Sequence, residues 1–538
     1  MTNRAFKTGT CREQTSFLPS RIEDYVSPGN VVRAIDAYVG TVDLQTLGFR
    51  NAGYEGGVGQ PPYDPADLLK LYLYGYLNRI RSSRYLEREA QRNIELIWLL
   101  KNLTPGYRTI ANFRKDNWAA LRAANREFVV LIRELDLVSG TLVAIDGAFF
   151  HGDASKASIK SRRRLADQLA AIDRDVEAYG SALEANDAEE ATRSADDGSG
   201  GCDDGDVAAK VAALMEKRAQ AQAELAQLEQ SGATQLSTTD ADARLMSKHG
   251  QVVAGYNVQI AVDEKHKLIV ASEVVNDGND AGQLYEMAKA AKQALGTQTL
   301  EVVADTGYYN GPALKDCEEN GIVPYVPPAE RTGRLEAEGR FTHEDFAYDA
   351  EENVYRCPAG ALLLPTKSPK INSGRREIVY LSRKATCAAC PLRARCLTAK
   401  ADTRTIYRWE HQDVIDRHRV RMEHAGARMR QRTCLVEHPF GTLKCRAGYR
   451  HFLVRGFNKV RGEWSLMALC YNFSRVLSIL GFQGFIDYLA RRLAERAILC
   501  ALGITTRLMG RVTALAGRIC ARLAEKSAIF RFSWRLAV

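Results

Sequence analysis

The sequence predicts a protein of several domains, with an N-terminal helical region followed by a mixed α/β region. The chain has 538 residues, too many for one hydrophobic core at about 100–200 residues per domain. Residues 27–135 place apolar side chains at helical spacing, whereas short Val- and Ile-rich runs alternate with helical patterns beyond residue 140. Such runs are typical of buried strands, and their alternation with helices predicts an α/β domain.

Charge is distributed unevenly along the chain. The formal net charge is +9, yet residues 175–240 are acidic and the region after 400 is strongly basic. A concentrated basic surface suits a polyanion such as nucleic acid, although a mildly basic enzyme has a similar composition. No secretory signal and no run of about 18 apolar residues is apparent, so we expect a cytoplasmic protein without a membrane partner.

The N-terminal region, 1–135, is predicted to be a helical DNA-binding domain. One helix is expected to begin at Asp64, followed by Pro65, because this pair is typical of a helix start. Arginines recur along the polar side of this region, and we expect Arg79, Arg81 and Arg84 to contact DNA. The alternative is a helical packing domain whose arginines face solvent.

The α/β region contains a strand, an interruption, and then further strands and helices. "LVAID" predicts a strand with Asp146, and residues 158–235 predict a helical hairpin because they are rich in Ala, Leu, Glu, Lys and Arg. "VVAGYNVQIAVDEKHKLIVASEVVN" then predicts a β-hairpin, and "LEVVAD" a strand that ends at Asp305. Without the interruptions the order is β-β-β-α-β-α-β-α.

A second interruption, residues 328–412, is rich in cysteine and has only a weak helical pattern. Its spacing, C-x29-C-x2-C-x5-C, predicts a structural zinc site. Reduced or redox-active thiols and an iron–sulfur cluster are the alternatives. The four cysteines are Cys357, Cys387, Cys390 and Cys396.

Three acids stand at corresponding places on these elements. Asp146 and Asp305 lie in or at the end of predicted strands, and Glu437 lies on a later predicted helix. Each alone could be a turn, cap or salt-bridge residue. If they converge, three carboxylates repel one another unless cations neutralise them, and Mg²⁺ prefers such oxygen ligands. Two ions of this kind support in-line phosphodiester displacement.

These motifs resemble the DDE insertion-sequence transposases, of the IS-four/IS-five-like group and its IS-eleven-eighty-two branch. The resemblance covers about residues 5–475 and is carried by "TPGYRTIANFRKDN", "VAIDGAFF", "VVADTGYYNG" and "VEHPFGTLKCRAGYRHFLVRG". It implies a catalytic domain at 140–475 with an RNase H-like, five-stranded mixed sheet flanked by helices. It also implies that Asp146, Asp305 and Glu437 form a catalytic triad that binds two Mg²⁺ or Mn²⁺ ions.

The family signature places a lysine seven residues after the glutamate, and Lys444 has that spacing. The arginine expected four residues before the glutamate is replaced by Thr433. We expect Lys444 to contact a DNA phosphate. Further DNA contacts are expected from the basic residues around Glu437, which are Arg430, Arg432, Arg446, Arg450 and Arg455.

The function implied is transposition of an insertion sequence. Such an enzyme binds the terminal inverted repeats, cleaves at the element ends and joins the 3′-OH to target DNA, and it acts as a homodimer or a larger synaptic complex. A metal-dependent nuclease without strand transfer and a non-catalytic repressor are the alternatives. Residues 476–538 are expected to form a basic amphipathic tail.

Overall fold

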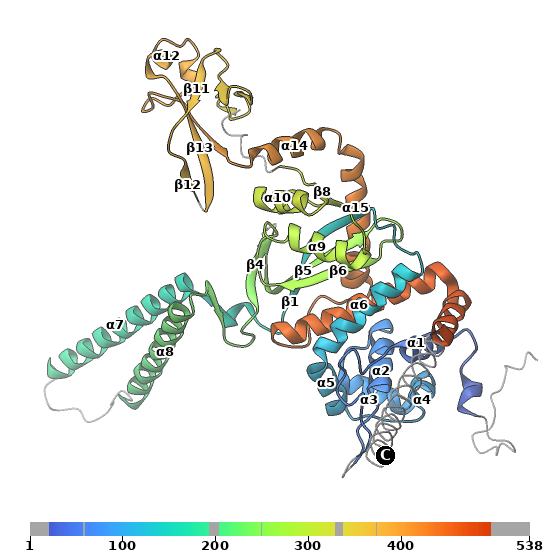
Figure 1. Cartoon of the computed structure of the whole chain (residues 1–538). Helices are drawn as coiled ribbons and strands as arrows, with labels where there is room; N and C mark the ends of the chain where they lie inside the picture. The colour runs from blue at the N-terminus through green and yellow to red at the C-terminus, as the bar shows by residue number, and fades with distance from the viewer. Residues whose placement is uncertain are drawn as a thin grey trace, which may run out of the picture. The chain divides into compact units, whose positions relative to one another are not determined.

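The structure is a computed structural model that describes residues 21–56, 60–192, 204–248, 250–328, 337–372 and 374–495 (Figure 1). The chain divides into two compact units, which are described separately. The first contains Met1–Ala124 and Leu469–Val538, and the second contains Asn125–Ala468.

The described elements of the first unit are helical. α2 begins as predicted, because the Asp64 side chain accepts a hydrogen bond from Ala66 N (2.8 Å) and Pro65 occupies the first turn. Nearly every α2 side chain is buried, as its almost uninterrupted apolar sequence requires. The elements are η1 (Ile22–Tyr25), α1 (Val31–Thr41), α2 (Pro65–Leu77), α3 (Ser83–Arg92), α4 (Ile94–Leu99), α5 (Tyr107–Asp116) and α6 (Trp118–Glu134), which crosses the boundary at residue 124.

The arginine-rich stretch after α2 differs from the prediction. The helix ends at Leu77, and Arg79 has a left-handed backbone (φ 63°), a conformation that a helix cannot continue through. Arg79 and Arg81 therefore lie in the connection to α3 rather than along one helical face. Arg81 is buried, with 8% of its surface exposed, so it is not on the solvent-facing side where we expected it.

A long helix, Phe457–Glu495, follows the π-turn η4 (Gly441–Arg446). Among the described residues it alone is long and apolar enough to span a membrane by length and composition, but 56% of its apolar window is buried, as in a core helix. In the first unit, Phe473 and Phe485 are fully buried and pack edge to face, with ring centroids 5.5 Å apart. The described part of the predicted tail, 476–495, thus belongs to this helix, and the rest lies outside the described residues.

The second unit contains a mixed six-stranded sheet in the order β4-β5-β1-β7-β8, with β6 also paired to β5. β1, β7 and β8 are parallel, whereas β5 is antiparallel to β1, β4 and β6. The predicted β5–β6 hairpin is confirmed. β4, with the mixed sequence RLMSK, was not predicted. The strands are β1 (Leu142–His151), β4 (Arg244–Lys248), β5 (Gln251–Asp263), β6 (Ile269–Val275), β7 (Leu300–Val303) and β8 (Ile322–Tyr325).

Helices contact this sheet and complete an α/β arrangement. α9 contacts β1, β5, β6 and β7, and α15 contacts β1, β5 and β7. α15 contains Pro439, which cannot donate a backbone hydrogen bond, and the helix continues into a wider π-helical turn. The elements are α9 (Leu284–Leu295), η3 (Thr306–Tyr308), α10 (Gly311–Glu319), α14 (Gln412–Glu423), α15 (Gly426–Phe440) and the π-turn η4 (Gly441–Arg446).

Two long helices occupy the segment predicted as a helical hairpin. α7 (Arg162–Thr192) and α8 (Asp204–Ser231) lie side by side (Figure 1). At their base, β2 (Ile159–Ser161) pairs antiparallel with β3 (Gln235–Ser237), next to the short η2 (Lys156–Ser158). This two-stranded pairing closes the segment where the chain enters and leaves it.

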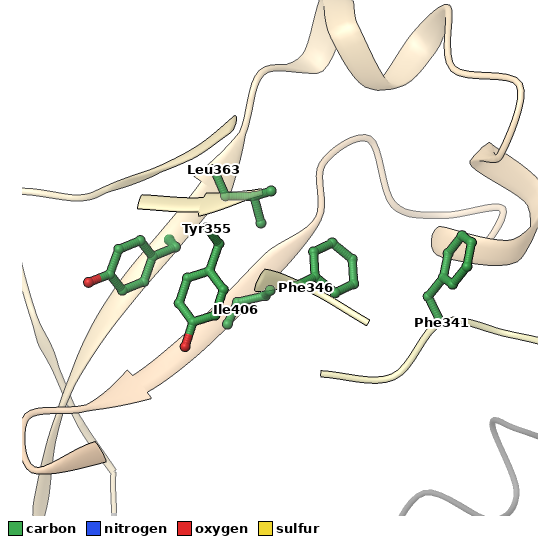
Figure 2. Close-up of a cluster of buried hydrophobic side chains, with 6 residues drawn as sticks. Phe341, Phe346, Tyr355, Leu363 and Ile406 are labelled. Atoms are coloured by element: carbon green, nitrogen blue, oxygen red, sulfur yellow. The ribbon is translucent and has the colours of Figure 1, made fainter. Parts of the chain in front are cut away.

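The cysteine-rich segment is an antiparallel sheet rather than weakly helical. Its strands run in the order β12-β13-β11-β10-β9, with β14 paired to β13. Figure 2 shows its core, in which Phe341, Phe346, Tyr355, Leu363 and Ile406 are buried together with Tyr380. The elements are β9 (Ala347–Asp349), β10 (Val354–Arg356), β11 (Leu362–Pro365), β12 (Lys370–Asn372), β13 (Arg375–Ser382), α12 (Lys384–Ala388), α13 (Arg393–Cys396) and β14 (Thr405–Trp409).

His418 on α14 makes the stability of the second unit depend on pH. Burial, and then the positive charge of Arg421, lower its pKa to about 4 from 6.5, and its Nε2 accepts a hydrogen bond from Val326 N (3.4 Å). Between these two pH values the unfolded chain binds more protons at His418 than the folded chain does. The free energy that neutral His418 contributes to folding is therefore fully present above pH 6.5 and decreases as the pH falls toward 4. We expect chemical denaturation to show this loss in the wild-type protein and a smaller one in His418→Gln. Equal pH profiles would contradict the assignment.

Candidate active site

Asp146 and Asp305 lie at the same edge of the mixed sheet. β1 and β7 are parallel, with Ala144 opposite Val303, and each aspartate lies two residues beyond its member of that pair. Extending this parallel register by two residues places the two aspartates at the same level of the sheet. The structure thus brings together two of the three acids that the sequence singled out.

Local hydrogen bonds orient both carboxylates. Gly147 N donates to Asp146 Oδ1 (2.9 Å), and Gly307 N donates to Asp305 Oδ1 (2.9 Å). Asp305 is also the N-cap of η3, which is the structural role that a lone aspartate at a strand end was expected to have. Capping and a role in a shared site are compatible, because a carboxylate accepts several hydrogen bonds.

A third aspartate, Asp280, lies beside them and was missed in the sequence. It precedes α9 in "NDGNDAGQL" and is buried, with 7% exposed. A methyl group built on Gly147 would lie 2.8 Å from Asp280 Oδ1, and one built on Gly307 would lie 3.8 Å from Asp280 Oδ2. Asp280 therefore lies between the glycines that follow Asp146 and Asp305. In the sequence, Asp280 has only the features of a residue at the start of a helix.

Tyr308 reports the closeness of the three aspartates. Burial, and then the negative charges of Asp280, Asp146 and Asp305, raise the pKa of Tyr308 well above its usual value. The Tyr308 hydroxyl donates to Gln259 Oε1 on β5. The buried Tyr308 thus stays neutral and adds no charge next to these carboxylates.

Glu437 lies on α15, the helix on which the sequence placed it. α15 contacts β1, β5 and β7. The helix therefore packs on β1, which contains Asp146, and on β7, which leads to Asp305; we call the place where these two residues lie the aspartate edge. Leu435, Val436 and Phe440 on α15 are buried, whereas Glu437 is exposed. The structure therefore places Glu437 on the expected helix, while its participation in a triad stays a prediction.

The segment after Glu437 is tied to β1. Lys444 Nζ donates to Phe149 O (2.7 Å) and lies 4.5 Å from the ring centroid of Phe150. Farther along, Phe452 N donates to His151 O (2.8 Å). Lys444, expected to contact a phosphate, thus holds the π-turn onto the strand that carries Asp146.

We expect Lys444→Met to lower the melting temperature, because the Phe149 carbonyl loses a charged donor worth about 1.5–3 kcal/mol. The salt dependence of DNA binding provides a separate measurement. A pure phosphate contact would lower the slope of log K against log salt by about one and leave stability unchanged. Lys217→Met, at an exposed lysine on α8, is the control.

The donor chemistry at the aspartate edge fits a hard divalent cation. Asp146, Asp280 and Asp305 offer carboxylate oxygens, which Mg²⁺ and Mn²⁺ prefer. Within the part of the chain that the structure describes, no group of three or more His, Cys, Asp or Glu side chains is gathered closely enough to hold a metal ion. The side chains would have to close around an ion.

The arginines around Glu437 differ in exposure. Arg455 forms an ion pair with Asp153 (2.7 Å), and Arg450 Nε donates to Lys444 O (3.3 Å). Both contacts leave donors on the guanidinium groups. Arg432 is half-buried, and the exposed members are Arg430, Arg446, Arg450 and Arg455.

Arg79 and Arg84 are the exposed members of the predicted N-terminal set. The Arg84 guanidinium lies 5.3 Å from the ring centroid of Tyr107, a cation–π arrangement. This geometry orients Arg84 at the surface of the helical unit, where DNA contact stays a prediction.

The four cysteines predicted to bind zinc line one cavity of about 230 Å³. Cys387 Sγ donates to Ser382 Oγ (3.0 Å), and Cys357 Sγ accepts from Ala361 N (3.3 Å). Cys357 and Cys396 also pack against the hydrophobic core of Figure 2. All four thiols are free of disulfides, as zinc binding requires, but the described residues contain no group of His, Cys, Asp or Glu gathered closely enough to hold a metal ion. The structure therefore gives the predicted zinc site no support.

Comparison with known proteins adds independent findings. Residues 356–477 match the family described as "Transposase DDE domain", and residues 20–116 match "Transposase domain (DUF772)". The first segment contains Glu437 and Lys444, whereas Asp146 and Asp305 lie outside both. No curated protein matches the chain.

One solved structure is similar, a cryo-EM structure of a piggyBac transposase synaptic complex with hairpin DNA. It is 8% identical, with 87% of this chain and 82% of that chain covered at a TM-score of 0.29, a likeness from which we draw no conclusion. Two separate segments of the chain match transposase families, and these matches support a DDE transposase.

Proposed function

We propose that the protein is a DNA transposase of the IS-four/IS-five-like group, in its IS-eleven-eighty-two branch. It would bind the terminal inverted repeats of an insertion sequence, cleave DNA at the element ends and join the 3′-OH to target DNA. The observation that carries this proposal is that Asp146 and Asp305 each lie two residues beyond the paired Ala144 and Val303 of parallel strands, in a chain with two transposase-family segments.

The strand order supports an RNase H-like catalytic domain. β6, β5, β1, β7 and β8 follow one another across the sheet, with β1, β7 and β8 parallel and β5 and β6 antiparallel neighbours. β4 pairs with the first residues of β5, and β6 pairs with its later residues. Five strands thus form the width of the sheet, and β4 extends one edge lengthwise.

DDE transposases generally use divalent metal ions, and here Asp146, Asp305 and Glu437 would hold two Mg²⁺ or Mn²⁺ ions. When bound, such ions activate the attacking oxygen and stabilise the leaving oxygen. In cleavage, a water oxygen bonds to phosphorus and the P–O3′ bond breaks. In joining, the freed 3′-OH attacks a target phosphodiester and displaces its 3′ oxygen.

The basic residues would hold the DNA during these steps. Arg430, Arg446 and Arg450 are exposed near Glu437 and suit phosphate oxygens. Arg79 and Arg84 would serve the helical domain in binding the repeats. Because two ends are cut together, we propose a homodimer or larger synaptic complex, acting in the cytoplasm on nucleoid DNA.

A reaction with element-end DNA, target DNA and Mg²⁺ tests the proposal and its alternatives. Strand-joined products are expected from a transposase. Cleaved but unjoined DNA would instead indicate a metal-dependent nuclease, and bound, uncut DNA would indicate a repressor. The same reaction with EDTA in place of Mg²⁺ is the control, because cleavage that persists there comes from contaminating metal-independent nucleases.

A further inference from the structure

Asp280 is the acid at the aspartate edge that the proposed triad does not use. Its Oδ1 accepts hydrogen bonds from Asn257 Nδ2 (2.8 Å) and Gln259 Nε2 (2.7 Å), both on β5. The backbone of its loop is set by Gln283 N, which donates to Asp280 O (3.0 Å) at the start of α9. Two amides and one turn therefore fix the carboxylate in a buried position.

Other buried acids of this unit have ordinary structural roles. Asp263 accepts from the backbone N–H groups of Ser139 (3.0 Å), Gly140 (3.1 Å) and Lys265 (2.9 Å), and so closes a turn. Asp240 accepts from the Tyr256 hydroxyl (2.8 Å) and Gly456 N (3.0 Å). Neither lies beside two further carboxylates. Asp280 does, and burying a third negative charge there is costly unless a cation compensates it.

A second observation points to a ligand at the same place. Asn257 is fully buried, and its Oδ1 has no hydrogen-bond partner among the described residues. That oxygen lies 3.1 Å from where a methyl group on Gly147 would be, next to Asp146. An unpaired buried acceptor beside carboxylates suits a water molecule of a hydrated cation, since Mg²⁺ keeps several waters when bound.

Gly147 allows these groups to approach the strand. A methyl group there would lie 2.4 Å from Gln259 Nε2, nearer than side-chain atoms can come. With a Cβ at this position, the Gln259 amide and the Asp280 carboxylate would have to move away from β1. The site is thus built by side chains of β5, the loop before α9 and the bare backbone of β1.

We infer that Asp280 is a positioning residue of the aspartate site, which supplies a fixed third negative charge toward the divalent cation of Asp146 and Asp305. This inference depends on the proposed function. Asn257 and Gln259 hold the charge in place, and the free Asn257 oxygen accepts from the water shell of the ion. Asp280 thereby raises cation affinity without serving as a member of the triad.

The Asp280→Asn substitution separates charge from hydrogen bonding. Both amide donors bond to Oδ1, so an asparagine oxygen at that position retains both bonds while the charge is lost. Binding of Mn²⁺ to the full chain without DNA, measured by electron paramagnetic resonance, is expected to weaken about 10–100-fold. DNA binding and melting temperature without metal are expected to stay at wild-type values.

Asp277→Asn is the matched control, because Asp277 is exposed in the same loop and its carboxylate accepts from Gln283 (3.0 Å). If Asp280→Asn does not fold, Asp280→Ser, which is also neutral and can meet the amides, replaces it. Mn²⁺ affinity that falls in Asp146→Asn but not in either Asp280 variant overturns this inference alone. A wild-type chain that binds no Mn²⁺ overturns the proposed cation site as well.

Discussion

The Asp305→Asn variant is expected to lose DNA cleavage and joining by about a thousandfold or more. Asparagine keeps the shape and the oxygen that caps η3 through Gly307 N, so the fold should be retained. The negative charge at the end of β7 is lost. This charge would stabilise the transition state, through the metal ions, by several kcal/mol. Each 1.4 kcal/mol that is lost slows the reaction about tenfold.

The measurement is single-turnover cleavage of element-end DNA, with DNA binding measured in parallel. Asp316→Asn, on the following helix α10, is the control and should cleave at the wild-type rate. Strand joining that persists in Asp305→Asn would exclude this residue from the catalytic set. Binding that fails together with cleavage would point to misfolding, which circular dichroism would reveal.

Phe150→Ala is expected to destabilise the second unit by about 3–5 kcal/mol. Phe150 is fully buried, with its ring centroid 5.7 Å from Phe452, 5.4 Å from Trp464 and 6.3 Å from Phe440. Its removal leaves a cavity between β1 and the segments that follow Glu437. Cleavage should fall with stability, because α15 would no longer pack firmly on the strand with Asp146.

Thermal and urea unfolding measure this effect, and Phe149→Ala is the matched control. Phe149 is the preceding residue on the same strand, is only half-buried, and accepts the Lys444 hydrogen bond through its backbone. Phe149→Ala should lower the free energy of unfolding clearly less than Phe150→Ala does. Equal losses in the two variants would show that the aromatic cluster around Phe150 is not what holds the Glu437 segment.

Prediction from the sequence succeeded where a local pattern carries the information. Asp64 and Pro65 start α2, and the Val- and Ile-rich runs form β5 and β6. It failed where long-range pairing decides. Residues 347–409 form an antiparallel sheet whose short strands, such as Val354–Arg356, are too brief to show alternation. Arg81 is buried because a left-handed turn at Arg79 breaks an otherwise continuous helical pattern.

The candidate site shows the same division. Asp146 and Asp305 could be selected because each ends an apolar run, and their neighbourhood follows from a parallel register. Asp280 has no such signal, since an aspartate before a helix is most simply a start residue. Lys444 matched a family spacing, but its contact with Phe149 depends on how the π-turn folds back onto β1.

The sequence by itself determined which residue types are available and in which order, namely an aspartate in a strand, another after a strand, a helical glutamate and a basic C-terminal region. Those properties are local, because the spacing of apolar residues and the charge of a segment depend only on residues close together in the sequence. Only the tertiary structure decided that Asp280 lies beside the aspartates, that a side chain on Gly147 would meet Gln259 and Asp280, and that Cys357 and Cys396 pack against an apolar core. These are contacts between distant segments, and strand register and close packing, rather than local pattern, bring them together.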